Sequence, residues 1–220
     1  MSTPKVYLLV LTFLSFLCSP LPVHAGVQTP RFTHITSELG LSHDMVWCIL
    51  QDSQGFMWFG THDGLNRYDG YTFTVYRHLR SDPDSLSNST IYALYQDRSG
   101  TLWIGTAWGL DSFVGDAARF THYPAVTEAI AVIYEDTAAT LWIGTYGSGL
   151  FRYDRTADNA SGRGAFIQYL PDPADPHSLS DHTVMSIYED DSGTLWLGTA
   201  NGGLNVFDRA TEQFAHYRHD

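Results

Sequence analysis

A hexapeptide centred on tryptophan recurs four times along the chain, and this repetition restricts the possible folds more than any other feature of the sequence. Each copy places an apolar residue on either side of the tryptophan and continues with glycine and threonine. Successive tryptophans are 45, 39 and 54 residues apart. Self-similarity at such a period indicates an array of supersecondary units rather than a catalytic loop used once. The four copies are FMWFGT (56–61), TLWIGT (101–106), TLWIGT (140–145) and TLWLGT (194–199).

Each repeat has the pattern of four short strands. The segment before the tryptophan strand alternates apolar and polar residues and is rich in β-branched and aromatic types, as in TIYALYQD (90–97). A turn with aspartate follows, and a glycine in that turn suits a tight hairpin. A third strand begins at a Gly-Leu pair, and a fourth ends in tyrosine. Four antiparallel strands per repeat predict an all-β protein with the β-propeller fold.

The repeats define the blades of this predicted propeller. We expect blades at approximately 43–78, 88–124, 128–170 and 181–218, and almost no helix. A further strand-like segment, RFTHI (31–35), precedes them and matches the fourth strand of a blade. The predicted propeller is therefore partial, with about four four-stranded blades plus one extra N-terminal strand.

A partial propeller leaves a sheet edge and an apolar blade face open, which is a hazard for a soluble protein. We therefore expect this chain to be the N-terminal part of a longer propeller, in which the remaining blades cover the open faces. A small closed ring and a homodimer are the alternatives.

The first 25 residues have the pattern of a secretory signal peptide. Lys5 supplies positive charge, residues 6–17 are apolar, and Ala25 ends a segment with small residues at the expected cleavage positions. An apolar run of about 12 residues is too short to cross a bilayer. A lipoprotein cleavage before Cys18 is disfavoured by the bulky Leu17. We expect residues 26–220 to be the mature domain, periplasmic or secreted in a bacterium, without a membrane span after cleavage.

Charge and cysteine content exclude several classes of partner. The formal net charge is −12 and no basic stripe occurs, so nucleic acid and anionic membrane surfaces are not expected partners. Only Cys48 remains after signal cleavage, which rules out an intrachain disulfide. Its alternating apolar surroundings indicate a buried side chain.

The repeated tryptophans are candidates for the structural core rather than for ligand binding. Each occupies the same position in the middle of a predicted strand, where packing between blades is expected. Burying such a ring contributes roughly 3 kcal/mol. The four residues are Trp58, Trp103, Trp142 and Trp196.

Candidate ligand-binding residues lie where the repeats differ. The loop between the second and third strands and the loop that enters the first strand meet on one face of a propeller, so their residues form a rim. Exposed aromatic and short polar groups there suit a small ligand, such as an oligosaccharide. The rim candidates are His62, Asp63, Trp108, Tyr146, Asn201, Asn88 and Asp181.

The sequence gives little support for a catalytic or metal site. His43, His62 and His182 lie in converging loops but lack the spacing of metal ligands on one element. Nucleophile-elbow and paired-acid signatures are also missing from the sequence. The Glu-Asp pairs at 135–136 and 189–190 fall at hairpin turns, opposite the rim, and we interpret them as turn residues. We expect no cofactor and no metal.

The residues from Leu179 to Leu204, LSDHTVMSIYEDDSGTLWLGTANGGL, resemble the two-component regulator propeller repeat. Four tandem copies make this resemblance strong across residues 31–220. It implies the periplasmic, non-catalytic sensor region of a hybrid two-component histidine kinase, which binds a ligand and whose kinase activity resides in other domains. Repeat three departs from the pattern, because it has Thr137-Ala138-Ala139 where the others place glycine, and a different hairpin type is expected there.

A second hypothesis comes from another functional class. The repeats also resemble those of propeller lyases that open streptogramin-type rings. Such an enzyme needs a histidine and an acid near the axis together with a bound cation. His62 and Asp63 form the one loop pair that could begin such a site.

Overall fold

The computed structural model describes residues 32–113, 119–156 and 164–218. Residues from Ile35 onward form one compact unit, and every strand lies in it. The predicted signal peptide at 1–25 lies outside the described residues. The model has no described helix long and apolar enough to cross a membrane.

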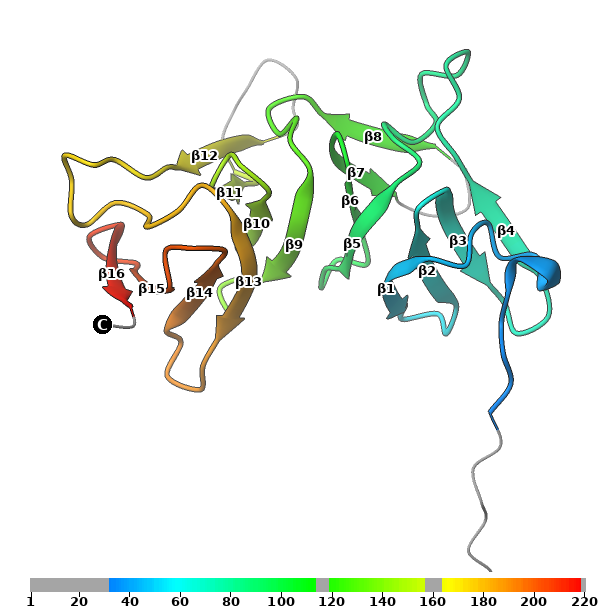
Figure 1. Cartoon of the computed structure of the whole chain (residues 1–220), viewed down its shortest axis with the longest axis horizontal. Coiled ribbons are helices and arrows are strands. Elements are labelled where there is room, and N and C mark those ends of the chain that lie inside the picture. The colour runs from blue at the N-terminus through cyan, green and yellow to red at the C-terminus, as the bar shows by residue number, and fades with distance from the viewer. Residues whose placement is uncertain (1–31, 114–118, 157–163, 219–220) are drawn as a thin grey trace, which may run out of the picture. The chain divides into compact units, whose positions relative to one another are not determined.

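Within the described residues, sixteen strands form four antiparallel sheets, which confirms the predicted all-β fold class (Figure 1). Each sheet takes its four strands in chain order, and we call the sheets blades 1 to 4. Blade 1 contains β1 (Val46–Gln51), β2 (Met57–Thr61), β3 (Gly64–Tyr68) and β4 (Phe73–Tyr76). Blade 2 contains β5 (Ile91–Gln96), β6 (Leu102–Thr106), β7 (Gly109–Phe113) and β8 (Phe120–Tyr123). Blade 3 contains β9 (Ile130–Glu135), β10 (Leu141–Thr145), β11 (Leu150–Asp154) and β12 (Ala165–Tyr169), and blade 4 contains β13 (Val184–Glu189), β14 (Leu195–Thr199), β15 (Leu204–Asp208) and β16 (Gln213–Tyr217).

The first hairpin of every blade is organised by one aspartate. In blade 2, Asp97 Oδ1 accepts hydrogen bonds from the backbone N–H groups of Ser99 and Thr101, at 2.9 and 3.0 Å. Its other oxygen accepts a hydrogen bond from the Trp103 indole Nε1 at 2.7 Å. Asp52, Asp136 and Asp190 receive the indole of their own tryptophan in the same way, at 2.7 to 2.8 Å. The turn residue therefore fixes the orientation of the repeated tryptophan.

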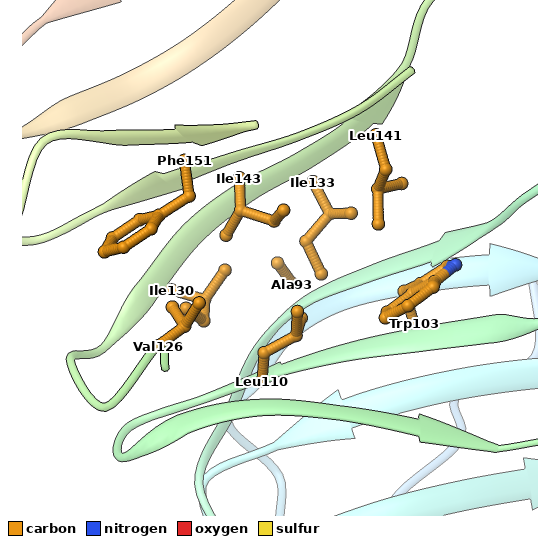
Figure 2. Close-up of a cluster of buried hydrophobic side chains, with 9 residues drawn as sticks. All are labelled: Ala93, Trp103, Leu110, Val126, Ile130, Ile133, Leu141, Ile143 and Phe151. Carbon is orange, nitrogen blue, oxygen red and sulfur yellow. The ribbon is translucent and has the colours of Figure 1, made fainter. Parts of the chain in front are cut away.

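The apolar core lies between blades. Figure 2 shows the cluster between blades 2 and 3, in which Trp103 and Leu110 face Ile130, Ile143 and other residues of the next blade. Each of the first three repeated tryptophans meets an aromatic ring of the following blade edge-on, at centroid distances of 5.1 to 5.6 Å. Trp58, Trp103 and Trp142 are accordingly 1–3% exposed, whereas Trp196 is only partly buried.

In blades 1 to 3, the glycine two residues after the tryptophan allows this close packing. A Cβ atom built on Gly105 would lie 2.6 Å from Cβ of Ile130 in the next blade. A Cβ atom on Gly60 would lie 2.8 Å from Ile91 and 2.4 Å from the Cys48 sulfur. Burial raises the pKa of the Cys48 thiol to about 12, so it behaves as a small apolar group.

Charged groups connect neighbouring blades at the hairpin end. Arg155 Nη2 contacts Asp97 of blade 2 at 2.9 Å and Glu135 of its own blade at 3.2 Å. Arg209 makes the equivalent bridge between Asp136 and Glu189. Each glutamate also accepts a hydrogen bond from the backbone of the preceding blade. The Glu-Asp pairs therefore connect blades as well as shape turns, which sequence analysis did not anticipate.

Two expectations differ from the structure. Residues 32–35 are in no strand, and Arg31 lies outside the described residues, so the described part of the predicted strand at 31–35 is not formed. A strand needs a partner, and each of the four sheets is already complete with its own four strands. A short 3₁₀ helix, Ser37–Leu39, follows instead.

The hairpin of repeat three is also of the same type as the others. Ala139 takes the position of the hairpin glycine with φ of 62°, and its N–H donates to the Asp136 carbonyl as the glycines do in the other blades. The aspartate hydrogen bonds therefore enforce a left-handed backbone on an alanine, at an intrinsic cost of about 1–2 kcal/mol.

Replacing Ala139 with glycine should stabilise the chain. The relief of left-handed strain, about 1–2 kcal/mol, exceeds the added entropy of the unfolded chain, about 0.4–1 kcal/mol. Urea denaturation should therefore show Ala139→Gly to be more stable by about 0.5–1 kcal/mol. Ala138→Gly is the matched control, since Ala138 is exposed and lacks a positive φ, and it should be destabilising. Destabilisation by both changes would contradict this account.

The Asp136 carboxylate should make stability fall in acid. Burial opposes its ionisation, but hydrogen bonds from Trp142 and Arg209 and the arginine charge outweigh this effect and lower its pKa. A lowered folded-state pKa stabilises the fold above about pH 4, and this contribution is lost as the pH falls through the folded-state pKa.

We therefore predict that Asp136→Asn lowers the free energy of unfolding at pH 7 by about 3 kcal/mol, because the amide nitrogen cannot accept from either donor. Urea titrations between pH 7 and pH 2 should also show a shallower loss of stability in this variant than in the wild type. Asp191→Asn, which changes an exposed hairpin aspartate of blade 4, is the control and should leave both quantities unchanged. Parallel pH profiles of wild type and Asp136→Asn would refute the assignment.

Candidate functional site

The loops that enter the first strands and the loops between the second and third strands are joined in every blade. A backbone hydrogen bond connects them at equivalent positions: His62 to Met45, Ala107 to Thr90, Tyr146 to Ala129 and Ala200 to Thr183, at 2.9 to 3.2 Å. These two sets of loops therefore lie at the same end of each blade. We call this end the rim, and the end with the β1–β2 and β3–β4 turns and their equivalents the hairpin end.

The rim continues from one blade to the next. The Thr90 hydroxyl of blade 2 donates to the His62 carbonyl of blade 1 at 3.0 Å. Between blades 3 and 4, Tyr146 and Thr183 form an isolated β-bridge, and the N–H of Gly149 donates to the His182 carbonyl at 2.7 Å. Candidate residues from different repeats are therefore brought to one surface.

His62 and Asp63 are adjacent but have different partners. The His62 ring lies 5.5 Å from that of His43, centroid to centroid. The Asp63 carboxylate instead pairs with Arg77 Nε at 3.2 Å, and Arg77 also donates to the Asp63 carbonyl. This ion pair fixes Asp63 at the outer side of its blade, because Arg77 follows the fourth strand.

The two aromatic rim candidates are exposed. Trp108 is 73% exposed, and its backbone N–H donates to the buried Thr106 hydroxyl, which fixes the base of the loop. Tyr146 is 44% exposed and contacts Tyr92 edge-on at a centroid distance of 5.8 Å. Both rings lie outside the clusters that hold the blades together.

The short polar candidates shape the loops. Asn88 and Asp181 occupy equivalent positions, and each accepts a hydrogen bond from the N–H two residues later, at 2.8 and 2.9 Å. Asp181 Oδ2 also accepts the N–H of Asn201 at 2.8 Å. Burial disfavours ionisation of Asp181, but the backbone donors of Thr183 and Asn201 outweigh it, so its pKa is lowered. A carboxylate is therefore maintained on the rim of blade 4.

Sequence analysis missed one group of side chains near the rim. Each first strand contains a register shift of one residue: between Val46 and Cys48 in β1, and at the equivalent place in β5, β9 and β13. The residue within this bulge is Trp47, Tyr92, Ala131 or Met185. Plain alternation of apolar residues gives no sign of a bulge, but a second tryptophan in one repeat at a position where repeats differ was a signal that could have been used.

Within the described ranges, no three His, Cys, Asp or Glu side chains come together as ligands for a metal ion. His43 and His62 are near each other, whereas the His182 carbonyl is engaged at the junction of blades 3 and 4. The rim therefore offers exposed aromatic rings, amides and a carboxylate on a rigid frame. Such a surface can bind a polar molecule that also has apolar faces.

Comparison with known proteins agrees with this architecture. Residues 40–63, 85–108 and 178–201 match the family described as two component regulator propeller. The repeat of blade 3, which lacks the hairpin glycine, is outside these three segments. Histidine kinase P4 of Formosa agariphila is 46% identical over 56 residues, a stretch that covers 26% of this chain and 4% of the kinase.

Solved structures are similar over most of the chain. The extracellular domain described as that of the hybrid two component system BT3049 from B. thetaiotaomicron has a TM-score of 0.71 at 28% identity, covering 85% of this chain and 26% of that one. The extracellular domain described as that of the one component system BT4673 of the same organism has a TM-score of 0.65 at 21% identity, covering 84% and 23%. Virginiamycin B lyase from Staphylococcus aureus has a TM-score of 0.56 at 17% identity, covering 79% and 55%.

This chain thus spans about a quarter of the length of these two extracellular-domain chains. The three matched segments fall in the repeats of blades 1, 2 and 4, each of which has the Asp-turn-Trp hairpin and forms a four-stranded sheet. Three of the four repeats therefore match the two component regulator propeller family.

Proposed function

We propose that this chain is the ligand-recognition part of a bacterial sensor of the two-component type, exported by a signal peptide cleaved near Ala25. The observation that carries the proposal is the likeness, at 28% identity and a TM-score of 0.71, to an extracellular domain described as part of a hybrid two component system. The match of three repeats to the regulator propeller family supports it independently. In this role the chain binds the ligand and transmits the signal, and any kinase activity belongs to other domains.

The ligand is recognised at the rim. At the hairpin end, the aspartates, glutamates and arginines are bonded to one another and to the backbone, so their polar groups are committed to structure. On the rim, Trp108, Tyr146 and Asn201 are exposed, and they differ from the residues at the same positions in other repeats. A small oligosaccharide has the hydroxyls and apolar faces that suit these groups.

The exposed face of blade 4 indicates a protein partner as well. In blades 1 to 3 the repeated tryptophan is covered by the following blade, whereas Trp196 borders a pocket of about 340 Å³ together with Tyr188 and Leu204. Tyr188 and Tyr217 on this face are 61% and 58% exposed. We propose that another four-stranded blade covers this face, supplied by the remaining part of a longer sensor, with a second copy of the chain as the alternative.

Lyase activity is the weaker alternative. The likeness to virginiamycin B lyase at 17% identity concerns the fold alone. His62 and Asp63, which could begin such a site, have separate partners: Asp63 pairs with Arg77, and His62 lies beside His43. The geometry therefore favours recognition over catalysis.

Replacing Trp108 with alanine should weaken ligand binding without changing stability. Its ring is 73% exposed and touches none of the core clusters, so the free energy of unfolding should change by less than about 0.5 kcal/mol. Thermal-shift and calorimetric titrations with a panel of neutral and uronate-containing hexasaccharides should identify a binder that the variant binds roughly tenfold more weakly.

Tyr71→Ala is the matched control, since Tyr71 is 92% exposed but lies in the β3–β4 turn at the hairpin end. It should bind the same sugar as the wild type does. Equal affinities for wild type and Trp108→Ala, or a larger loss in Tyr71→Ala, would show that the rim is not the recognition surface.

A further inference from the structure

A β-bulge occurs at the same place in the first strand of all four blades. The register skips one residue, which leaves Trp47, Tyr92, Ala131 and Met185 unpaired in the ladders of β1, β5, β9 and β13. Bulges redirect side chains and are enriched beside functional sites. The backbone therefore presents one variable side chain per blade, two residues after the hydrogen bond that fixes the rim.

These bulges lie on neighbouring edge strands. Each of β1, β5, β9 and β13 is an edge strand of its sheet and pairs in the ladder with the second strand alone. The four strands contact one another in chain order, β1 with β5, β5 with β9 and β9 with β13. Their redirected side chains therefore follow one another along a single surface below the rim.

Three aromatic rings form a continuous row on this surface. Trp47 lies edge-on to Tyr92 at 5.3 Å, and Tyr92 lies edge-on to Tyr146 at 5.8 Å, centroid to centroid. Blade 3 has the small Ala131 at its bulge, and its contribution to the row is Tyr146 from the rim. The row thus crosses three blades and ends within the surface already proposed to bind ligand.

Core packing does not account for this row. Trp47 and Tyr146 are 50% and 44% exposed, and Tyr92 is partly buried. None of the three belongs to the apolar clusters between blades. Aromatic rings lined up on a surface, with polar groups at one border, are typical of a binding site rather than of a folding core.

The charges at the rim favour an uncharged ligand. Arg77 of this rim is already paired with Asp63, and on blade 4 the rim has both the Asp181 carboxylate and Arg218, whose Nε donates to the Gly202 carbonyl at 3.2 Å. The chain as a whole carries a net charge of −12. An anionic ligand would meet this field without a compensating cation on the row, whereas a neutral sugar presents C–H groups to rings and hydroxyls to amides and hydroxyl groups.

We propose that Trp47, Tyr92 and Tyr146 form a binding row for an uncharged oligosaccharide, which runs from the rim along the bulged edge strands. This inference rests on the proposed function and deepens it by naming a second, inner part of the site and by specifying that the oligosaccharide is uncharged. Trp108 and Asn201 then hold the ligand at the rim, and the row binds the sugar units that follow.

The test uses the purified full chain and neutral hexasaccharides, namely cellohexaose, xylohexaose, mannohexaose and arabinohexaose, with hexagalacturonate as the anionic comparison. Calorimetric titration should show that at least one neutral sugar binds and that hexagalacturonate binds at least tenfold more weakly. Trp47→Ala should weaken the neutral sugar roughly tenfold or more, and Trp47→Phe should restore most of the affinity.

Met185→Ala is the matched control. Met185 occupies the bulge of blade 4 and is 43% exposed, but it is no part of the aromatic row. Its replacement should leave the affinity unchanged. Should Trp47→Ala misfold, oxidation of wild-type indoles by N-bromosuccinimide with peptide mass mapping provides the second measurement, in which bound sugar should protect Trp47.

The outcomes separate this inference from the proposed function. Loss of binding in Trp108→Ala with normal binding in Trp47→Ala overturns the row and leaves the rim. Loss of binding in Trp47→Ala alone supports the row and removes the rim assignment. Normal binding in both variants overturns the row and the rim assignment together. Absence of binding by all four neutral sugars, preference for hexagalacturonate, or a dimer in light scattering that Trp47→Ala dissociates would each overturn the row as an oligosaccharide site.

Discussion

The hydrogen bond from the tryptophan indole to the hairpin aspartate is the interaction on which the rest of the structure depends. One carboxylate closes the turn through backbone N–H groups and orients the ring that fills the gap between blades. An indole N–H buried without a partner would cost about 1–3 kcal/mol, so the aspartate is what allows the ring to be buried at all. In blades 2 and 3 the same carboxylate also forms an ion pair with an arginine of the next blade. Folding of a blade and docking of its neighbour are therefore coupled through a single side chain.

The fold could be predicted from the sequence because this unit is local. The turn aspartate, the tryptophan and the glycine lie within nine residues of one another, so each repeat carries the whole pattern. The bridging arginines were not predicted, since Arg155 and Asp97 are far apart in the sequence and the repeats differ there. The glutamate and the arginine are present or absent together. Blades 3 and 4 have both, whereas blade 2 has Gln96 in place of the glutamate. In the sequence, Gly115, which lies outside the described residues, stands where blades 3 and 4 have the arginine. A buried glutamate without its arginine would be costly, and the neutral amide avoids this cost.

The candidate site could be predicted only in part. Strand order alone places the β2–β3 loops beside the entering loops, and the four backbone hydrogen bonds of the rim follow from that order. Which rim side chains remain available depends on partners in other strands, as the Asp63–Arg77 pair illustrates. Ala139 shows the converse, because the hydrogen bonds of the Asp136 hairpin override the conformational preference of an alanine. The extra strand expected at 31–35 was inferred from sequence likeness to a fourth strand, but a strand also requires a partner.

The two ends of the blades thus differ in which substitutions the fold tolerates. At the hairpin end of blades 2 and 3, a substitution of the aspartate or of its arginine partner removes an ion pair that joins two blades. Along the edge strands, by contrast, all four blades have the same β-bulge, but the residue at the bulge differs: it is tryptophan, tyrosine, alanine or methionine. A bulged residue makes no ladder hydrogen bond and leaves the core clusters unchanged, so its identity can vary with little effect on folding. A repeated scaffold can in this way present a different surface in each blade, and the row of Trp47, Tyr92 and Tyr146 is the particular surface that this sequence presents.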